Sequence, residues 1–305
     1  VVLLAECGFI DTYHLNDYVI NGREHPLTFN RNQSVIDEDF KAFAVWLKEF
    51  NQGKEVRDRV WLVGADVLFR NSIATNALQL VEEFVVHLSD YQKRLLEEWA
   101  FLGNEYDEAY FASRSLIDLT RPADSISNII GDAAKERKLT FRQQYLLQGI
   151  ASLSLSIQFN AQRSKSSTPR FGSVYNKRDS AMFRNAMWIA DHRPNARMVV
   201  FGHNGHIEKD FGNTSLPMTT RFGHLLRARY GSSYFVIGTE AGRGEFFYHG
   251  RISGRKDRLG TIMVQSGLGT GLLITNGTPA LARFLDGRFT MTYGTSGPLA
   301  GSFAR

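Results

Sequence analysis

Four short apolar runs along the chain predict β-strands. They span residues 1–6, 59–66, 196–203 and 233–240 and are rich in β-branched residues. None alternates strictly between apolar and polar positions, which is typical of strands that helices cover on both faces. Helical patterns separate the runs, so the sequence predicts an α/β fold with a mostly parallel sheet flanked by helices. The chain opens directly on the first run, and we expect an N-terminal segment to precede it.

The second and third runs are separated by about 130 residues, far more than one crossover helix requires. Apolar spacing predicts helices over 71–100, 105–118, 122–137 and 140–162, and the second should end before Pro122. We interpret residues 67–175 as a large helical insertion within a single domain of residues 1–305. The insertion either encloses a substrate over the strand ends or is structural padding. The glycine- and threonine-rich segment 265–305 has no assigned role.

Each apolar run ends in an ionisable residue: Glu6, Asp66, His203 and Glu240. In parallel α/β sheets the ligand crevice lies beyond the carboxyl ends of the strands. The sequence therefore predicts that Glu6, Asp66 and His203 line a common pocket. The alternative interpretation is that each residue is simply the first solvated position after its strand.

Residues 177–196 predict a helix that stops before Pro194. One face of this helix mixes polar and apolar residues: Arg178, Met182, Asn185 and Ile189. A cation gains nothing from the helix dipole in the first turn, so another partner should hold Arg178 there. A carboxylate or a substrate oxygen would serve, because guanidinium binds either through two parallel hydrogen bonds. The alternative is a surface arginine beside Asp179.

The third run ends in His203, and His206 follows three residues later, each preceded by a glycine. Glycines permit a tight turn and a close backbone approach, which suits a loop over a ligand. Two histidines at this spacing could bind zinc, although no H-E-x-x-H helix and no third histidine lie nearby. The sequence has no convincing G-x-S-x-G elbow, which disfavours a serine nucleophile.

The segments "RDSAMFRNAMWI", "RMVVFGHNGHI" and "RFGHLLRARYGSSYFVIG" resemble the erythromycin esterase-like family in their order and spacing. "VVLLAE" and "WLVGAD" also resemble its glutamate strand and its G-x-D strand, so the resemblance runs from residue 1 to about 250. The resemblance implies an α/β core with a helical insertion. It also implies a soluble hydrolase that cleaves an ester or lactone with activated water, macrolide cleavage and antibiotic resistance being the named activity.

The same resemblance implies the site residues. It implies catalytic roles for His203, His206, Glu6, Arg178 and Asp66, and substrate-binding roles for Asn185, Asn204, Asp179 and Met182. A histidine steered by a carboxylate would take a proton from water, and Arg178 or a second histidine would stabilise the oxyanion. The E-x-x-H-G segment, which carries the principal base in the family, is not in this sequence. It lies in the preceding segment, or the chain is inactive.

Two other functions fit the same residues. The first is a metal-dependent hydrolase in which His203, His206, Glu6 and Asp66 bind zinc or manganese. The second is a non-catalytic protein that holds a ligand such as haem or a saccharide in the same cleft.

The composition limits the classes of partner that the chain is expected to bind. The 305 residues are 43% hydrophobic and 22% charged, which is ordinary for a globular enzyme with a large core. The net charge is +5, but the basic residues are dispersed among 31 acids, so we expect no nucleic-acid partner. No apolar stretch approaches the ~20 residues of a membrane span, and the lone Cys7 excludes an intrachain disulfide. We expect a small-molecule ester or lactone substrate, no required cofactor or metal, and a cytoplasmic location.

Overall fold

The structure is a computed structural model that describes residues 1–23, 38–67, 70–101, 110–111, 113–165, 172–209, 220–238, 244–246, 250–252, 265 and 267. The chain forms two compact units, Val1–Gly202 and His203–Arg305, and each unit is described by itself. No helix among the described residues is both long and apolar enough to cross a membrane. That residues 67–175 form an insertion within one domain stays a prediction. Nearly all of segment 265–305 lies outside the described residues.

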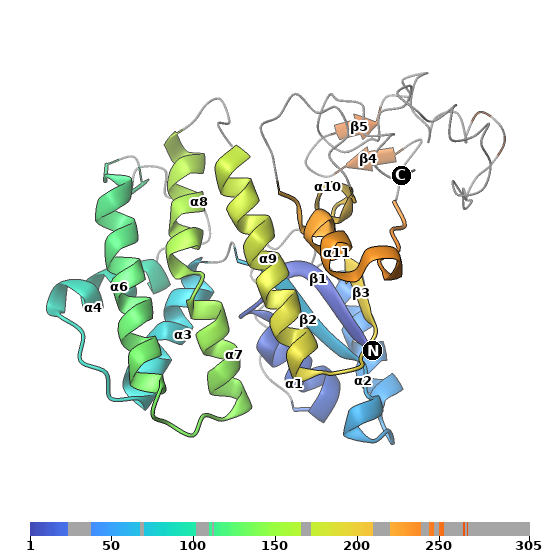
Figure 1. Ribbon diagram of the computed structural model, residues 1–305, viewed down its shortest axis with the longest axis horizontal. Helices are drawn as coiled ribbons and strands as arrows, with labels where there is room; N and C mark the ends of the chain where they lie inside the picture. Colours follow the sequence, from blue (N-terminus) through green and yellow to red (C-terminus); the bar gives the residue numbers. More distant parts are fainter. Residues whose placement is uncertain are drawn as a thin grey trace. The chain divides into compact units, whose positions relative to one another are not determined.

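A three-stranded parallel sheet forms the centre of the first unit (Figure 1). Its strands are β1 (Val2–Gly8), β2 (Trp61–Asp66) and β3 (Met198–Phe201), in the order β2-β1-β3. The register places Leu4 beside Val63 on one side and beside Val200 on the other. The predicted α/β fold with a parallel sheet is confirmed. Three of the predicted apolar runs form its strands.

Helices cover both faces of β2 (Figure 1). On one face lie α1 (Thr12–Asn21) and α2 (Glu38–Asn51), whose buried residues form a core with Leu62. On the other face α9 (Gly172–His192) contacts β2, and the ring of Trp61 lies 5.6 Å from that of Phe141. Burial on both sides explains why β2 has an unbroken apolar sequence, since every residue from Trp61 to Asp66 is buried.

The segment between β2 and α9 is helical over most of its described residues (Figure 1). It contains α3 (Arg70–Glu83), α4 (Asp90–Phe101), α6 (Leu116–Ala134), α7 (Phe141–Ile150) and α8 (Leu153–Lys165). The single helix predicted over 71–100 is wrong, because the chain leaves α3 near Val85, whose φ is +50°. The helix predicted over 140–162 is likewise divided between α7 and α8. Residues 102–109, part of the helix predicted over 105–118, lie outside the described residues.

The predicted helix end before Pro122 is wrong, because α6 contains this proline. Ser115 caps the helix by accepting a hydrogen bond from the Asp118 backbone N–H at 3.1 Å. The buried stripe of the helix begins at Leu119 and continues through Ala123 beyond the proline. Proline removes one backbone donor from a helix, and burial of this stripe outweighs that loss.

The second unit contains α10 (Asn204–Ile207), α11 (Phe222–Tyr230) and a 3-10 turn, Gly231–Ser233. A small antiparallel pair, β4 (Gly244–Phe246) and β5 (Gly250–Ile252), follows. The strand predicted over 233–240 is wrong for residues 234–238, which are irregular, and Glu240 lies outside the described residues. Phe235 and Ile237 are 71% and 59% exposed, so this apolar run has formed no strand in its described part. Strand propensity depends on packing against neighbours, and these two side chains are mostly in solvent.

Candidate active site

Arg178 of α9 binds the carboxylates of Asp66 and Glu6. Its Nε donates to Oδ1 of Asp66 at 2.9 Å, and one terminal nitrogen donates to Oδ2 at 2.6 Å. The same terminal nitrogen donates to Oε1 of Glu6 at 3.0 Å. Glu6 lies near the carboxyl end of β1 and Asp66 at that of β2, so the three side chains meet at one edge of the sheet.

A β-bulge lies at Glu6. Ala5 pairs with Gly64 and Gly8 pairs with Asp66, which leaves Glu6 and Cys7 opposite Ala65 alone. Bulges re-aim side chains and are common beside active sites. The bulge requires glycine at position 64, because a Cβ there would come closer than 3.0 Å to the carbonyl oxygens of Cys7 and Gly8.

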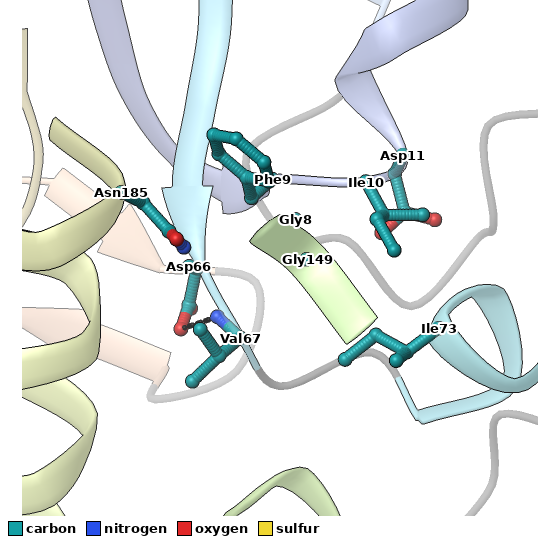
Figure 2. Close-up of a pocket in the computed structure, with 9 residues that line it drawn as sticks. All are labelled: Gly8, Phe9, Ile10, Asp11, Asp66, Val67, Ile73, Gly149 and Asn185. Atoms are coloured by element: carbon teal, nitrogen blue, oxygen red, sulfur yellow. Dashed lines mark hydrogen bonds between the residues drawn. The ribbon is translucent and has the colours of Figure 1, made fainter. Parts of the chain in front are cut away.

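Burial and charge distinguish the two carboxylates. The Asp66 side chain is 3% exposed and that of Glu6 is 16% exposed. Oδ1 of Asp66 also accepts from the backbone N–H of Val67 at 2.7 Å (Figure 2), so both oxygens of this carboxylate are engaged. Burial acts to lower the pKa of Arg178, but the charge and hydrogen bonds of Asp66 and then the charge of Glu6 raise it above its usual value. Asp66 therefore anchors a permanent cation, and that cation orients Glu6.

Three other predicted residues lie on the same helix. Met182 and Asn185 are each 1% exposed, and Asp179 is fully buried. Nδ2 of Asn185 donates to the Ala65 carbonyl at 2.9 Å, and its Oδ1 accepts from Nε2 of Gln148 at 2.9 Å. Asn185 thus links α9 to β2 and α7, and substrate binding by these three residues stays a prediction.

The start of α9 differs from the prediction. The helix begins at Gly172 rather than at residue 177, so Arg178 lies in its second turn. Arg178 is therefore not in the first turn, where the helix dipole acts most strongly. Its position is explained instead by the two carboxylates that it binds.

A small pocket lies between the ends of β1 and β2 and the helices around them (Figure 2). About 10 Å³ of it is open to a water-sized sphere, room for about one water molecule. Its lining includes Asp66, Asn185 and Asp11, and the Asp11 carboxylate accepts a short hydrogen bond from Ser72. Burial raises the pKa of Asp11 to about 6, with the Ser72 hydrogen bond opposing this and the charge of Asp66 adding to it.

Asp11 was not among the predicted site residues. The sequence carries one signal for it, because an aspartate that follows the first strand immediately before a helical pattern is a typical N-cap. In the structure it is the N-cap residue of α1, but its side chain does not cap the helix. Its carboxylate instead bonds to Ser72 of α3.

His203 begins the second unit and is the N-cap of α10. Its Nδ1 accepts a hydrogen bond from the backbone N–H of Gly205 at 3.1 Å. A ring nitrogen that accepts from an amide must carry a lone pair, so the neutral ring has its proton on Nε2. The turn therefore makes neutral His203 a hydrogen-bond donor at Nε2.

The two predicted neighbours of His203 are more deeply enclosed. Asn204 is 4% exposed and His206 is 6% exposed, whereas His203 is only partly buried. The rings of His203 and His206 lie 6.4 Å apart at 73°. Within the part of the chain that the structure describes, no three histidine, cysteine or acidic side chains are grouped so that they could hold a metal ion.

The comparison with known protein families finds a match over most of the chain. The sequence model of the erythromycin esterase family matches residues 1–262. A crystal structure of a Bacillus cereus protein is similar over 100% of this chain and 79% of its own, with 18% identity and a TM-score of 0.65. A mutant of erythromycin esterase EreC in its open conformation is similar over 90% of this chain and 75% of its own, with 16% identity and a TM-score of 0.63.

A third structure is more distant. A succinoglycan biosynthesis protein is similar over 80% of this chain and 58% of its own, with 16% identity and a TM-score of 0.56. At these identities the three structures show a shared fold. No curated protein matches the chain.

Proposed function

This chain belongs to the erythromycin esterase family, and from that premise we propose that it hydrolyses an ester or a lactone with an activated water molecule. The observation that carries the proposal is the binding of Arg178 to Asp66 and Glu6 where two parallel strands end. This edge of an α/β sheet is where such folds bind their ligands. A buried cation between a buried and a partly buried carboxylate is costly to assemble, and active sites are where such arrangements concentrate.

Glu6 is the carboxylate that we propose for proton transfer. Glu6 is the more exposed of the two carboxylates, and Arg178 fixes one of its oxygens. A carboxylate held in this way can accept a proton from a water molecule that attacks a carbonyl carbon. The position of Glu6 on a bulge is consistent with this role.

His203 is the group that we propose for the oxyanion. That Glu6 and His203 serve one site is the expectation from the sequence, in which each closes an apolar run, and it is kept here as part of the proposal. With its proton on Nε2, neutral His203 would donate to the carbonyl oxygen as charge develops there. This role differs from the one expected from the sequence, in which the histidine takes the proton.

The proposed reaction has two steps. Water adds to the carbonyl carbon, its proton passes to Glu6, and the carbonyl oxygen becomes an oxyanion that accepts from His203. The intermediate then expels the alcohol, which receives the proton from Glu6, and a carboxylic acid is released. Water is consumed and no other reactant is needed. Because one structural relative is an erythromycin esterase, a macrolide lactone is the first substrate to test.

The test uses the full-length protein with erythromycin and with simple nitrophenyl esters, followed by mass spectrometry and absorbance. Glu6→Gln and His203→Asn should each lower kcat/KM by about 100-fold or more. Asparagine retains an oxygen that can cap Gly205, so His203→Asn should fold normally. The matched control is His224→Asn, an exposed histidine on α11, which should keep full activity.

Two results would contradict the proposal. The first is a folded protein that hydrolyses none of these substrates. The second is an activity that chelation removes and zinc restores, which would favour the metal-dependent hydrolase instead. Tight ligand binding without hydrolysis would favour the non-catalytic alternative.

A further inference from the structure

We propose that Arg221 and Tyr234 are positioning residues that hold the turn from His203 to Glu208 in the geometry that hydrolysis requires. The inference rests on the proposed function of His203, and it extends the site to residues outside the His-Asn-Gly-His sequence of residues 203–206. All of the contacts that carry it lie within the second unit.

A buried ion pair fixes the end of the turn. Glu208 follows α10 directly and is fully buried, and its Oε1 lies 3.5 Å from Nε of Arg221. The Arg221 side chain is 12% exposed. A carboxylate removed from water to this degree stays ionised only with a cationic partner and further hydrogen bonds. The pair thus ties the last residue of the turn to the start of α11.

Gly223 allows α11 to approach the backbone of the turn. A Cβ at this position would come closer than 3.0 Å to the carbonyl oxygens of Ile207 and Glu208. Any larger residue would push the first turn of α11 away from these two carbonyls. The glycine therefore lets the start of α11 lie close to the turn, with Arg221 Nε 3.5 Å from Glu208 Oε1, which gives a physical reason for its place in the "RFGHLL" segment.

Tyr234 holds the same stretch of backbone by a second bond. Its hydroxyl donates to the Ile207 carbonyl at 2.6 Å. Burial raises the pKa of Tyr234 above its usual value, so the hydroxyl keeps its proton and remains a donor at any pH near neutrality. Gly231, whose φ is +56°, turns the chain after α11 and precedes Tyr234 by three residues.

Gly205 connects these contacts to the ring of His203. A Cβ built on Gly205 would lie 3.1 Å from Nδ1 of His203 and 3.7 Å from a terminal nitrogen of Arg221. Gly205 thus lies close to both the imidazole and the guanidinium, and its N–H is the donor that fixes the His203 proton on Nε2. A shift of the turn would weaken this bond and allow the proton to occupy Nδ1. Arg221 and Tyr234 are therefore expected to control which ring nitrogen of His203 is the donor.

The test compares Tyr234→Phe with the wild type in the full-length protein. Phenylalanine keeps the ring and removes only the hydroxyl. Nitrogen NMR of the His203 ring, assigned with the His203→Asn variant, should show mainly the Nε2–H form in the wild type and a mixture in Tyr234→Phe. The kcat of the variant should fall by about 10- to 100-fold with KM unchanged, since small displacements of a catalytic group have effects of this size. Tyr230→Phe, a partly exposed tyrosine on α11, is the matched control and should change neither readout.

Arg221 needs two variants, because removing its charge alone leaves Glu208 buried without this partner. Arg221→Lys keeps the charge and should retain most of the Nε2–H form. The double variant Arg221→Gln, Glu208→Gln removes both charges and should shift the His203 proton as Tyr234→Phe does. A purely structural role would lower the thermal stability in each case and leave the proton on Nε2.

The two proposals fail in different ways. If the wild type hydrolyses esters but the variants leave the His203 proton and kcat unchanged, the positioning role is wrong. If the wild type hydrolyses nothing while Tyr234→Phe moves the proton, the positioning of the turn stands and the proposed function is wrong.

Discussion

Replacing Arg178 with methionine removes the guanidinium that binds Asp66 and Glu6. Three charge-assisted hydrogen bonds are lost, at 2.9, 2.6 and 3.0 Å. Methionine fills much of the space of the arginine stem, so the loss is mainly electrostatic rather than a cavity. Removing one member of a buried ion pair typically costs about 3 to 5 kcal/mol, because the remaining charge is left in the interior. Against a usual domain stability of about 5 to 15 kcal/mol, this is a large fraction.

The assay is urea unfolding near pH 7, with Arg184→Met as the matched control. Arg184 lies on the same helix but is exposed, so its replacement should change the unfolding free energy by less than about 0.5 kcal/mol. A second measurement near pH 4 should show a smaller loss for Arg178→Met. In the variant, protonation of the remaining carboxylates at low pH removes the cost of burying their negative charge. The difference in unfolding free energy between the variant and the wild type therefore becomes smaller as the pH falls.

The reasoning would be refuted by an Arg178→Met variant as stable as Arg184→Met. It would also be refuted by a loss that is equal at both pH values. Either result would mean that Asp66 and Glu6 do not depend on Arg178 in the folded protein.

Two further predictions follow from the buried groups near this cluster. Because the pKa of Asp11 is raised to about 6, the folded state binds the proton of this carboxyl group more tightly than the unfolded state does. Protonated Asp11 therefore contributes about 3 kcal/mol at most to the free energy of unfolding at low pH, and this contribution is lost as the pH rises from about 4 to 6. Asp11→Asn should remove that slope in unfolding measurements across this range, and an unchanged slope would contradict it. Asn185→Ala should cost about 2 to 3 kcal/mol in urea unfolding, because it leaves the Ala65 carbonyl and the Gln148 amide without this buried partner. A cost below about 0.5 kcal/mol would show that these bonds are not needed.

The ends of the strands were visible in the sequence because they are local features. Glu6 and Asp66 each close an apolar run, and parallel strands bring their carboxyl ends to one edge. The sequence also predicted a carboxylate or a substrate oxygen as the partner of Arg178. It could not choose between them, because Arg178 and Asp66 are 112 residues apart and only the packing of α9 on β2 brings them together.

Other features depend on side-chain contacts that a local sequence pattern does not indicate. The turn was predicted from its glycines, but the ring nitrogen of His203 that accepts from Gly205 is set by side-chain geometry. The helix through Pro122 forms because its buried stripe continues past the proline, which outweighs the local preference. Arg221 and Glu208 were not predicted, because an arginine and a glutamate so placed in sequence are more often solvated.

The most direct test of the account is a double-mutant cycle on kcat/KM for ester hydrolysis, with Glu6→Gln, His203→Asn and the double variant. If both residues act on the same transition state, the account predicts that the double variant loses little more activity than the worse single variant. Losses that multiply in full would contradict the claim that Glu6 and His203 serve one site.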